Sequence, residues 1–455
     1  MYDILIKNAL YPDFEQMQLV KGDIAVADGK IAAIGQINEP ANEIIDASGH
    51  IVSPGFIDIH MHEENFPLEG KEYIISNLML QMGVTTGLAG SCGDVRQPIR
   101  MFKEVLEEKQ GYPINILMQS GYNSIRSKSG LSRYEPATDE QIKALTDIMQ
   151  DELEQGAYGI SFGLEYDPGI PYEEVVKVIK SFPYEEMYVS MHYRADSVGA
   201  IDSIHEMIGF TNDTGCRFQI SHLSSCAAMG QMKEALELIN EAVKQNLKLN
   251  YDTYPYNAFS ARIGTAVFDE GCFEAWGKTY SDLYMPSGKY ANQFCTKETF
   301  EELRRDDPGR YLVAFAMNED EIAAAIANPA CGMIASDGQV KDHAGHPRAA
   351  GTFPRILGKY VREDKVISMI DALKKMTIVP AERLTLHKKG RIEVGCDADL
   401  TIFNPDTVMD GATFENIFIK PTGIDYVILD GKIALKDGEI VNARAGKFIP
   451  GPYVK

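Results

Sequence analysis

The sequence predicts a (β/α)8 barrel with a small β-sandwich beside it. From residue 55 to about residue 340, eight short apolar runs alternate with longer amphipathic stretches, which is typical of parallel strands joined by helices. Both ends of the chain instead carry β-branched alternation and Asp-Gly turns, which predict hairpins. Residues 257–317 fit neither pattern, so we expect them to interrupt the barrel as an insertion.

Each apolar run is short enough to be a strand that is buried on both faces. The runs are GFIDIHMH (55–62), VTTGLAGSC (84–92), INILMQSG (114–121), YGISFGLEY (158–166), MYVSMHYR (187–194), FQISHLS (218–224), LKLNYDTYPY (247–256) and GMIASDG (332–338). Helices are expected between them: ATDEQIKALTDIMQDELEQG, for example, has a Thr-Asp-Glu start and a Gly stop. A barrel is therefore predicted over residues 55–388.

The two chain ends are expected to share one β-sandwich, made of residues 1–54 and 389–455. The segments VADGKIAAIG and ILDGKIALKDG, one from each end, resemble each other weakly. Residues 257–317 are too long for an ordinary connection. We interpret them as a lid over the barrel mouth, with a disordered loop as the alternative.

Composition excludes several classes of partner. The net charge of −22 opposes binding to nucleic acids and to anionic membranes, and no block of Lys and Arg reverses it locally. No apolar run approaches the roughly 20 residues that span a bilayer. Seven cysteines without short paired spacings predict reduced thiols and a cytoplasmic protein. The sequence does not indicate an oligomeric state.

Residue types that bind metals stand where the predicted strands end, which is where barrels of this kind place their active sites. They are His60, His62, Cys92, His192, His222 and Asp337. Taken singly, each reads as a packed histidine, a small buried thiol or a turn residue. Five strands that end in this way predict a shared metal site, and imidazoles with a thiolate favour zinc over magnesium or calcium. With Asp337 as general base and then acid, the set predicts hydrolysis of a C–N bond.

Several segments make the chain resemble the amidohydrolase superfamily and, within it, the N-acyl-D-amino-acid deacylases (D-aminoacylases). They are PGFIDIHMH, GSCGD, SFGLEYDPG, SMHYRADS, QISHLSS, DTYPYNA, ASDGQV and HPRAAGTFPRILGKYVRE. GSCGD and HPRAAGTFPR are the segments more specific to the deacylases. The resemblance implies a zinc-dependent enzyme that removes the acyl group from N-acyl-D-amino acids. It implies one tightly held zinc at Cys92, His192 and His222, and a second, weaker position at His60, His62 and Asp337.

The resemblance also implies a substrate that carries a carboxylate. It points to Arg348 as the anchor, since a guanidinium can hold a carboxylate with two hydrogen bonds. Tyr254 or Tyr256 would assist it.

The chain departs from the family pattern after the sixth strand. Ser224 stands where family members often have a lysine that binds the carboxylate, and serine supplies no charge. A different anchor, such as Arg194 or Lys341, and a substrate without a carboxylate therefore both stay open. Glu165, at the end of the fourth run, is a further carboxylate on the rim to which we assign no role.

Three alternatives compete with the deacylase. A hydantoinase or dihydroorotase would need a carboxylated lysine from the fourth strand, and YGISFGLEYDP contains no lysine. A deaminase of the same superfamily would use the four histidines and Asp337 but leave Cys92 idle. A metal-binding or assembly protein without catalysis is the third, although Asp337 and all four histidines are present.

Overall fold

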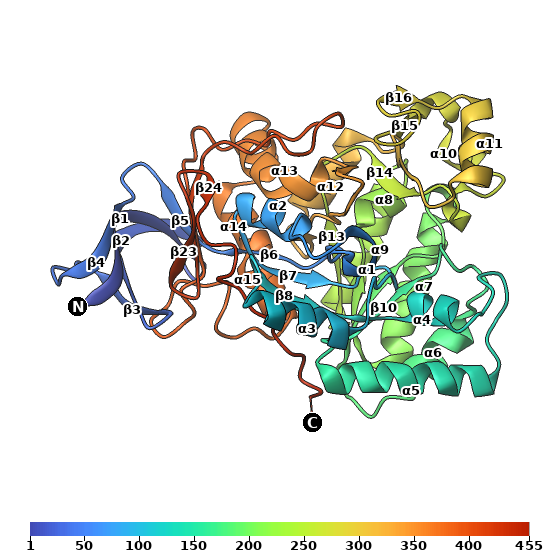
Figure 1. Cartoon of the computed structure of the whole chain (residues 1–455), viewed down its shortest axis with the longest axis horizontal. Helices are drawn as coiled ribbons and strands as arrows, with labels where there is room; N and C mark the ends of the chain where they lie inside the picture. Colours follow the sequence, from blue (N-terminus) through green and yellow to red (C-terminus); the bar gives the residue numbers. More distant parts are fainter. Residues whose placement is uncertain (455) are drawn as a thin grey trace.

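Parallel strands close into a barrel at the centre of the molecule (Figure 1). The computed structural model describes residues 1–454, apart from the side chain of Glu69. The barrel strands are β6 (Phe56–Asp58), β7 (Val84–Ala89), β8 (Asn115–Met118) with β9 (Ser120–Gly121), β10 (Ile160–Gly163), β11 (Tyr188–His192), β12 (Arg217–Ile220), β13 (Leu249–Thr253) and β18 (Met333–Ile334). Their pairings are all parallel, and a Met61–Gly338 bridge joins the last strand to the first. The predicted (β/α)8 barrel is confirmed.

The strands end earlier than the apolar runs do. Because β6 ends at Asp58, His60 and His62 lie after the strand that the apolar run 55–62 predicts, and strand alternation does not set the direction of their rings. Backbone hydrogen bonds to the segment after the last strand hold them instead. Asp337 N donates to the His60 carbonyl (2.8 Å), and His62 N donates to the Gly338 carbonyl (3.0 Å).

Helices surround the barrel. The main ones are α2 (Ile75–Gln81), α3 (Ile99–Lys109), α5 (Asp139–Gln155), α6 (Tyr172–Lys180), α7 (Ala200–Thr214), α9 (Met232–Lys244), α12 (Glu319–Ala327) and α14 (Met369–Met376). The expected start and stop of α5 are confirmed: Thr138 and Gln141 form a capping box, and Gly156 ends the helix with φ of 118°. Further helices are α1 (Phe66–Glu69), α4 (Tyr122–Lys128), α8 (Leu223–Ala227), α13 (Arg348–Arg355), which continues as a π-helical turn (Ile356–Glu363), and α15 (Ile378–Arg383).

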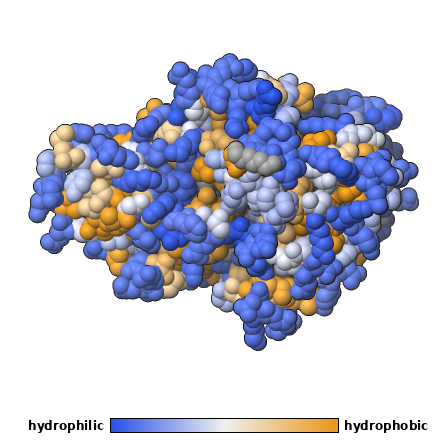
Figure 2. Space-filling view, turned by 90° about the horizontal axis from the view of Figure 1, so that it is seen from below, coloured by the Kyte–Doolittle hydropathy of each residue, from blue (hydrophilic) through white to orange (hydrophobic). Residues whose placement is uncertain are grey.

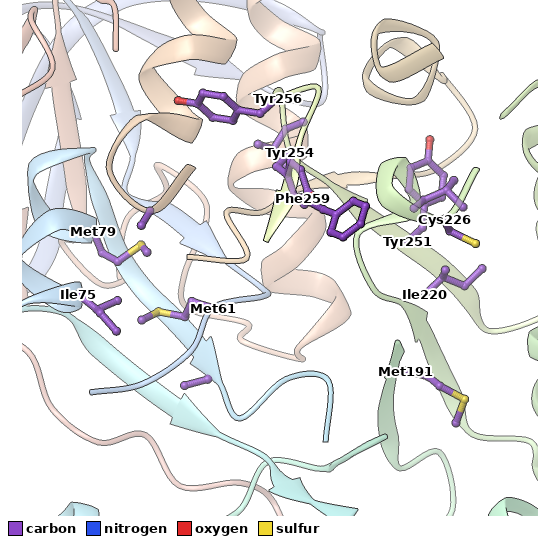
Figure 3. Packing of buried hydrophobic residues seen from close by; sticks show 14 of the residues in the cluster. Met61, Ile75, Met79, Met191, Ile220, Cys226, Tyr251, Tyr254, Tyr256 and Phe259 are labelled. Atoms are coloured by element: carbon purple, nitrogen blue, oxygen red, sulfur yellow. The ribbon is translucent and has the colours of Figure 1, made fainter. Parts of the chain in front are cut away.

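Tight packing between the first strands and α2 fixes the start of the barrel. Figure 3 shows Met61, Ile75 and Met79 gathered in one part of the core, and all three side chains are buried. A Cβ atom on Gly87 of β7 would lie 2.4 Å from the sulfur of Met61. Only glycine leaves room here for the loop that carries His60 and His62.

Strands from both chain ends form one nine-stranded sheet at one end of the molecule (Figure 1). They are β1 (Tyr2–Asp13), β2 (Gln18–Ala27), β3 (Lys30–Gly35), β4 (Ala41–Asp46), β5 (Ile51–Pro54), β21 (Leu400–Phe403), β22 (Ile424–Leu429), β23 (Lys432–Lys436) and β24 (Glu439–Ile440). The antiparallel pair β5 and β21 joins the two ends. Val52, Leu400 and Ile428 share a core of their own, separate from that of the barrel.

The last residues of the chain leave this sheet, which corrects the assignment of the whole 389–455 segment to the sandwich. Gly446 and Phe448 form bridges with Tyr112 and Ile116 of the barrel, and Gly451 N donates to the carbonyl of Gly156 (3.0 Å). The tail therefore packs against the barrel.

Residues 257–317 form an ordered unit that contains a small antiparallel sheet, so the alternative of a disordered loop was wrong. Its strands are β14 (Phe259–Arg262), β15 (Leu283–Met285), β16 (Gln293–Phe294) and β17 (Tyr311–Ala314), with helices α10 (Cys272–Trp276) and α11 (Lys297–Asp306). The ring of Trp276 packs against the rings of Phe259 (5.3 Å) and Phe268 (5.9 Å). Figure 1 shows this unit at the end of the molecule opposite the terminal sheet.

The outer surface is mainly hydrophilic on the face seen in Figure 2, where hydrophobic residues appear in separate small patches. Among residues 1–454, no helix combines the length and the apolar character that crossing a bilayer requires.

Candidate metal centre

Side chains of metal-binding types from the ends of five barrel strands meet at the C-terminal rim. Their ligand atoms form two groups, each with all its atoms within 4.8 Å of one another: His60, His62, Cys92 and Asp337 in one, and Cys92, His192 and His222 in the other. All six side chains are buried. The structure therefore brings together every residue that the sequence suggested as a metal ligand.

Cys92 belongs to both groups and lies between them. Its Sγ atom is 3.3 Å from His60 Nε2 and 3.4 Å from His222 Nε2. Burial raises the pKa of the Cys92 thiol to about 11, and nearby Asp337 and Asp252 add to this, whereas His60 opposes it. Without a metal, the sulfur at the centre of the cluster thus holds a proton at neutral pH.

Asp337 faces the histidines of the first strand and an arginine. Its Oδ1 atom lies 3.1 Å from His62 Nε2 and 3.4 Å from His60 Nε2, and its Oδ2 atom lies 2.8 Å from Arg348 Nη2. Burial alone would raise the pKa of Asp337, but Arg348 and His60 outweigh it and hold that pKa well below its usual value. Asp337 is therefore ionised at neutral pH and able to accept a proton.

Three of the clustered residues have a left-handed backbone, with φ of 58° at Cys92, 35° at His222 and 48° at Asp337. Residues other than glycine rarely adopt this conformation, although asparagine, aspartate and histidine do so more often than the rest, and each instance costs about 1–3 kcal/mol. All three follow the end of a barrel strand, so the reversed turn is what aims each side chain at the cluster.

Asp252, at the end of β13, orients two of the histidines and was missed in the sequence. Its Oδ1 atom accepts a hydrogen bond from His222 N (2.8 Å) and lies 3.1 Å from His60 Nδ1. Ser225 Oγ lies 2.7 Å from His222 Nδ1. With their Nδ1 atoms engaged, both rings turn Nε2 toward Cys92. A carboxylate inside the seventh apolar run was the signal that could have identified Asp252.

Glu165, to which the sequence analysis assigned no role, also lies in the cluster. Its Oε2 atom is 2.6 Å from His192 Nε2. Burial raises the pKa of Glu165 to about 8 and lowers that of His192 to about 3. His192 Nδ1 is buried and has no hydrogen-bond partner within residues 1–454, so this atom is available to a metal.

The residues predicted to bind substrate divide into two sets. Arg348 lies over the ring of Tyr254 at 4.6 Å; both are buried, and the Nε and Nη1 atoms of Arg348 and the hydroxyl of Tyr254 have no hydrogen-bond partner in the described part of the chain. Ser224 is buried on α8, where its hydroxyl is also unpaired within that part. Tyr256 instead donates to Asp410 Oδ2 (3.2 Å), so its hydroxyl is already engaged.

The two residues considered as alternative anchors for a substrate carboxylate, Arg194 and Lys341, already have hydrogen-bond partners within the protein. Arg194 pairs with both carboxylate oxygens of Glu206, through Nη2 at 2.8 Å and Nε at 3.0 Å. Lys341 Nζ donates to the carbonyl of Gly309 (2.7 Å). Of the three candidate anchors, Arg348 alone has buried nitrogens without a hydrogen-bond partner in the described part of the chain.

The unit of residues 257–317 covers the cluster. Two small cavities, of about 20 and 10 Å³, touch the metal-binding side chains. Their walls include residues of this unit: Phe259, Ser260, Ala261, Arg262, Thr265, Val267 and Tyr311. Closure of this kind keeps bulk water away from reacting groups.

The sequence model that describes the amidohydrolase family matches residues 51–434. The chain belongs to the amidohydrolase family. This match spans the barrel and the strands of the terminal sheet that flank it, so the family assignment rests on most of the chain.

Relatives of this amidohydrolase include deacylases. A D-aminoacylase of Alcaligenes xylosoxydans xylosoxydans is 27% identical over 98% of this chain and 97% of its own length. The crystal structure of an N-acyl-D-glutamate deacylase from Bordetella bronchiseptica, complexed with zinc and a phosphonate that mimics the tetrahedral intermediate, superposes with a TM-score of 0.87, with 27% identity and 99% coverage of both chains. An L-hydantoinase from Arthrobacter aurescens, covered over 100% of its chain and 99% of this one, has a TM-score of 0.63 at 16% identity, which shows the shared fold alone.

Proposed function

We propose that this amidohydrolase is a zinc-dependent deacylase of N-acyl-D-amino acids. The observation that carries the proposal is the position of Cys92 between the two ligand groups, 3.3 Å from His60 and 3.4 Å from His222. A thiol at that point can take the place of a carboxylated lysine, and the fourth barrel strand, Ile160–Gly163, has none. The full-length similarity to D-aminoacylases supports the same assignment.

The donor atoms of the cluster fit zinc. Thiolate sulfur and imidazole nitrogen are ligands that Zn²⁺ prefers, whereas Mg²⁺ and Ca²⁺ select oxygen. We assign the tight position to Cys92, His192 and His222, and a weaker second position to His60, His62 and Asp337, as the two groups of ligand atoms allow. A bound zinc would polarise the amide carbonyl and make water acidic enough to attack it.

Asp337 moves the proton in this proposal. Its carboxylate, kept ionised by Arg348, takes a proton from the attacking water and later delivers it to the amide nitrogen as the C–N bond breaks. His62 and His60 fix one carboxylate oxygen from the side of the first strand. The products are a carboxylic acid and a free D-amino acid, and one water is consumed.

Arg348 holds the substrate carboxylate. Its unpaired Nε and Nη1 atoms are buried beside the cluster. A buried charged donor without an acceptor is unfavourable, and the two oxygens of a substrate carboxylate would each accept a hydrogen bond from one of these nitrogens. The ring of Tyr254, 4.6 Å away, fixes the plane of the guanidinium.

We propose that the enzyme works in the cytoplasm on a small molecule, without a nucleic-acid or membrane partner. All seven cysteines are free thiols, which suits a reducing compartment. The net charge of −22 opposes phosphate backbones and anionic lipid surfaces.

The test is a substrate screen with metal content measured on the same preparation. It compares N-acetyl and N-formyl amino acids of both hands with hydantoins and dihydroorotate. We expect turnover of the D-amino-acid derivatives and at least one zinc per chain. Turnover confined to L-substrates or to cyclic amides would overturn the proposal. A Cys92→Ala variant that keeps zinc and activity would indicate a deaminase instead.

A further inference from the structure

A cavity of about 510 Å³ opens beside the metal cluster, which is the size of a pocket for a small ligand. Cys92 and Tyr166 form its inner end, so the cavity reaches the reacting centre. The rest of its wall comes from α1 and the residue before it, from α4 and the segment after it, from the loops after β7 and β10, and from the unit of residues 257–317. Arg348 is not part of this wall, so the cavity lies apart from the proposed carboxylate anchor.

Cations outnumber anions in this cavity, the reverse of the chain as a whole. Four basic side chains line it, Arg96, Lys128, Arg133 and Arg262, against two acidic ones, Asp94 and Asp167. The whole chain has 44 Lys and Arg against 66 Asp and Glu. A local excess of positive charge in so acidic a protein attracts an anion specifically to this place.

The acidic residues do not use up the positive charge. Asp94 lies between two guanidiniums, 3.2 Å from Arg262 Nη2 and 3.6 Å from Arg96 Nε. Asp167 lies 3.8 Å from Arg126 Nε, a further cation. Each carboxylate in the wall therefore already has an arginine partner.

Two arginines keep free hydrogen-bonding capacity. Arg133 Nη1 donates to the carbonyl of Gly264 (2.8 Å), and no carboxylate pairs with Arg133 in the described part of the chain. The Nε atom of Arg96 is buried and makes no hydrogen bond within residues 1–454. Both groups gain an acceptor when an anionic group enters the cavity.

We propose that this cavity selects substrates with a second anionic group, so that the enzyme prefers N-acyl-D-amino acids with acidic side chains, and that Arg133 and Arg96 determine this specificity. The inference rests on the proposed deacylase function. Arg348 holds the α-carboxylate, and the side-chain carboxylate enters the basic cavity on the side of Cys92 and Tyr166.

The test compares N-acetyl-D-glutamate with N-acetyl-D-glutamine, which has the same shape but no side-chain charge. We expect kcat/KM of the wild type to be at least about tenfold higher for the glutamate derivative, the value of one charge-assisted hydrogen bond. Arg133→Gln and Arg96→Gln should each lower kcat/KM for the glutamate derivative by about tenfold or more and leave that for the glutamine derivative within about twofold.

Two controls accompany these variants. Lys289→Gln removes one positive charge from the same unit at a side chain that is 67% exposed, and it should leave the preference unchanged. Thermal unfolding of each variant checks that it folds, and Arg133→Gln is the safer variant because it leaves Asp94 with both of its partners.

Three results would overturn the inference. Equal turnover of the two substrates by the wild type would show that the cavity does not select charge. Equal losses on both substrates in the arginine variants would show that the cavity binds the α-carboxylate. Absence of turnover of every N-acyl-D-amino acid would refute the proposed function itself, and the inference with it, which distinguishes that failure from the other two.

Discussion

Zinc binding at the tight position should release one proton, and that proton comes from Cys92. The pKa of this thiol is about 11, so at pH 7 only about one molecule in 10⁴ carries the thiolate that the metal needs. Removing the proton at pH 7 costs about 5.5 kcal/mol, which is four pH units at about 1.36 kcal/mol each. His192, with a pKa of about 3, and His222, with a pKa well below its usual value, are already neutral.

The affinity for the first zinc should therefore rise about tenfold per pH unit, or about a hundredfold from pH 6 to pH 8. The zinc affinity rises with pH because the metal binds the deprotonated thiol, and this rise ends at the pKa of the thiol. Competition with a chromophoric chelator on metal-free protein measures this slope. Cys92→Ala should bind zinc at least about a hundredfold more weakly, with no such slope.

A matched control is Cys396→Ala, which removes a buried thiol far from the cluster, in the segment before β21. It should leave both the affinity and the slope unchanged. A zinc affinity that does not change between pH 6 and pH 8 would show that Cys92 is ionised without metal. A rise in affinity of about a hundredfold per pH unit would show that His192 or His222 holds a proton as well. Either result would refute the reasoning.

Three further changes test the site and the fold. Asp337→Asn should lower kcat by about 10²–10⁴ while one zinc per chain remains; loss of zinc together with activity would instead make Asp337 a ligand of the tight position. Lys389→Met should lower the free energy of unfolding by about 3–5 kcal/mol in urea titration. The change leaves the buried carboxylate of Asp399, whose Oδ2 lies 2.5 Å from Lys389 Nζ, without its positively charged partner. Gly55→Ala should lower the free energy of unfolding by about 1–3 kcal/mol in the same titration, because its Cβ would lie 2.1 Å from Thr85 Oγ1. An unchanged free energy of unfolding in either variant would contradict the packing described.

The barrel could be predicted because each of its strands is an apolar run bounded by amphipathic helices, and the residues ending those runs pointed to the cluster. The sequence did not show how the ligands are held. His60 and His62 lie beyond β6 and are fixed by hydrogen bonds to residues about 275 positions away, a contact that no local pattern encodes.

The roles of Asp252 and Glu165 also could not be predicted from the sequence. Their roles depend on which nitrogen of a neighbouring ring they face, at 3.1 Å from His60 Nδ1 and 2.6 Å from His192 Nε2, and a sequence does not contain ring orientations. The terminal tail was misplaced for a similar reason, because Gly446 pairs with Tyr112 through backbone atoms, which leave no trace in side-chain composition.

The left-handed backbone at Cys92, His222 and Asp337 has a consequence for anyone who improves this enzyme by directed evolution. A library screened for heat resistance alone would reward glycine or asparagine at Cys92 and His222, since those residues relax the turn. At Asp337 the same change would also leave Arg348 buried without its partner, which costs more than the turn returns. Under the proposed function, every variant selected at Cys92 or His222 would have lost a zinc ligand. Screens must therefore read out turnover in each round, or leave these codons untouched.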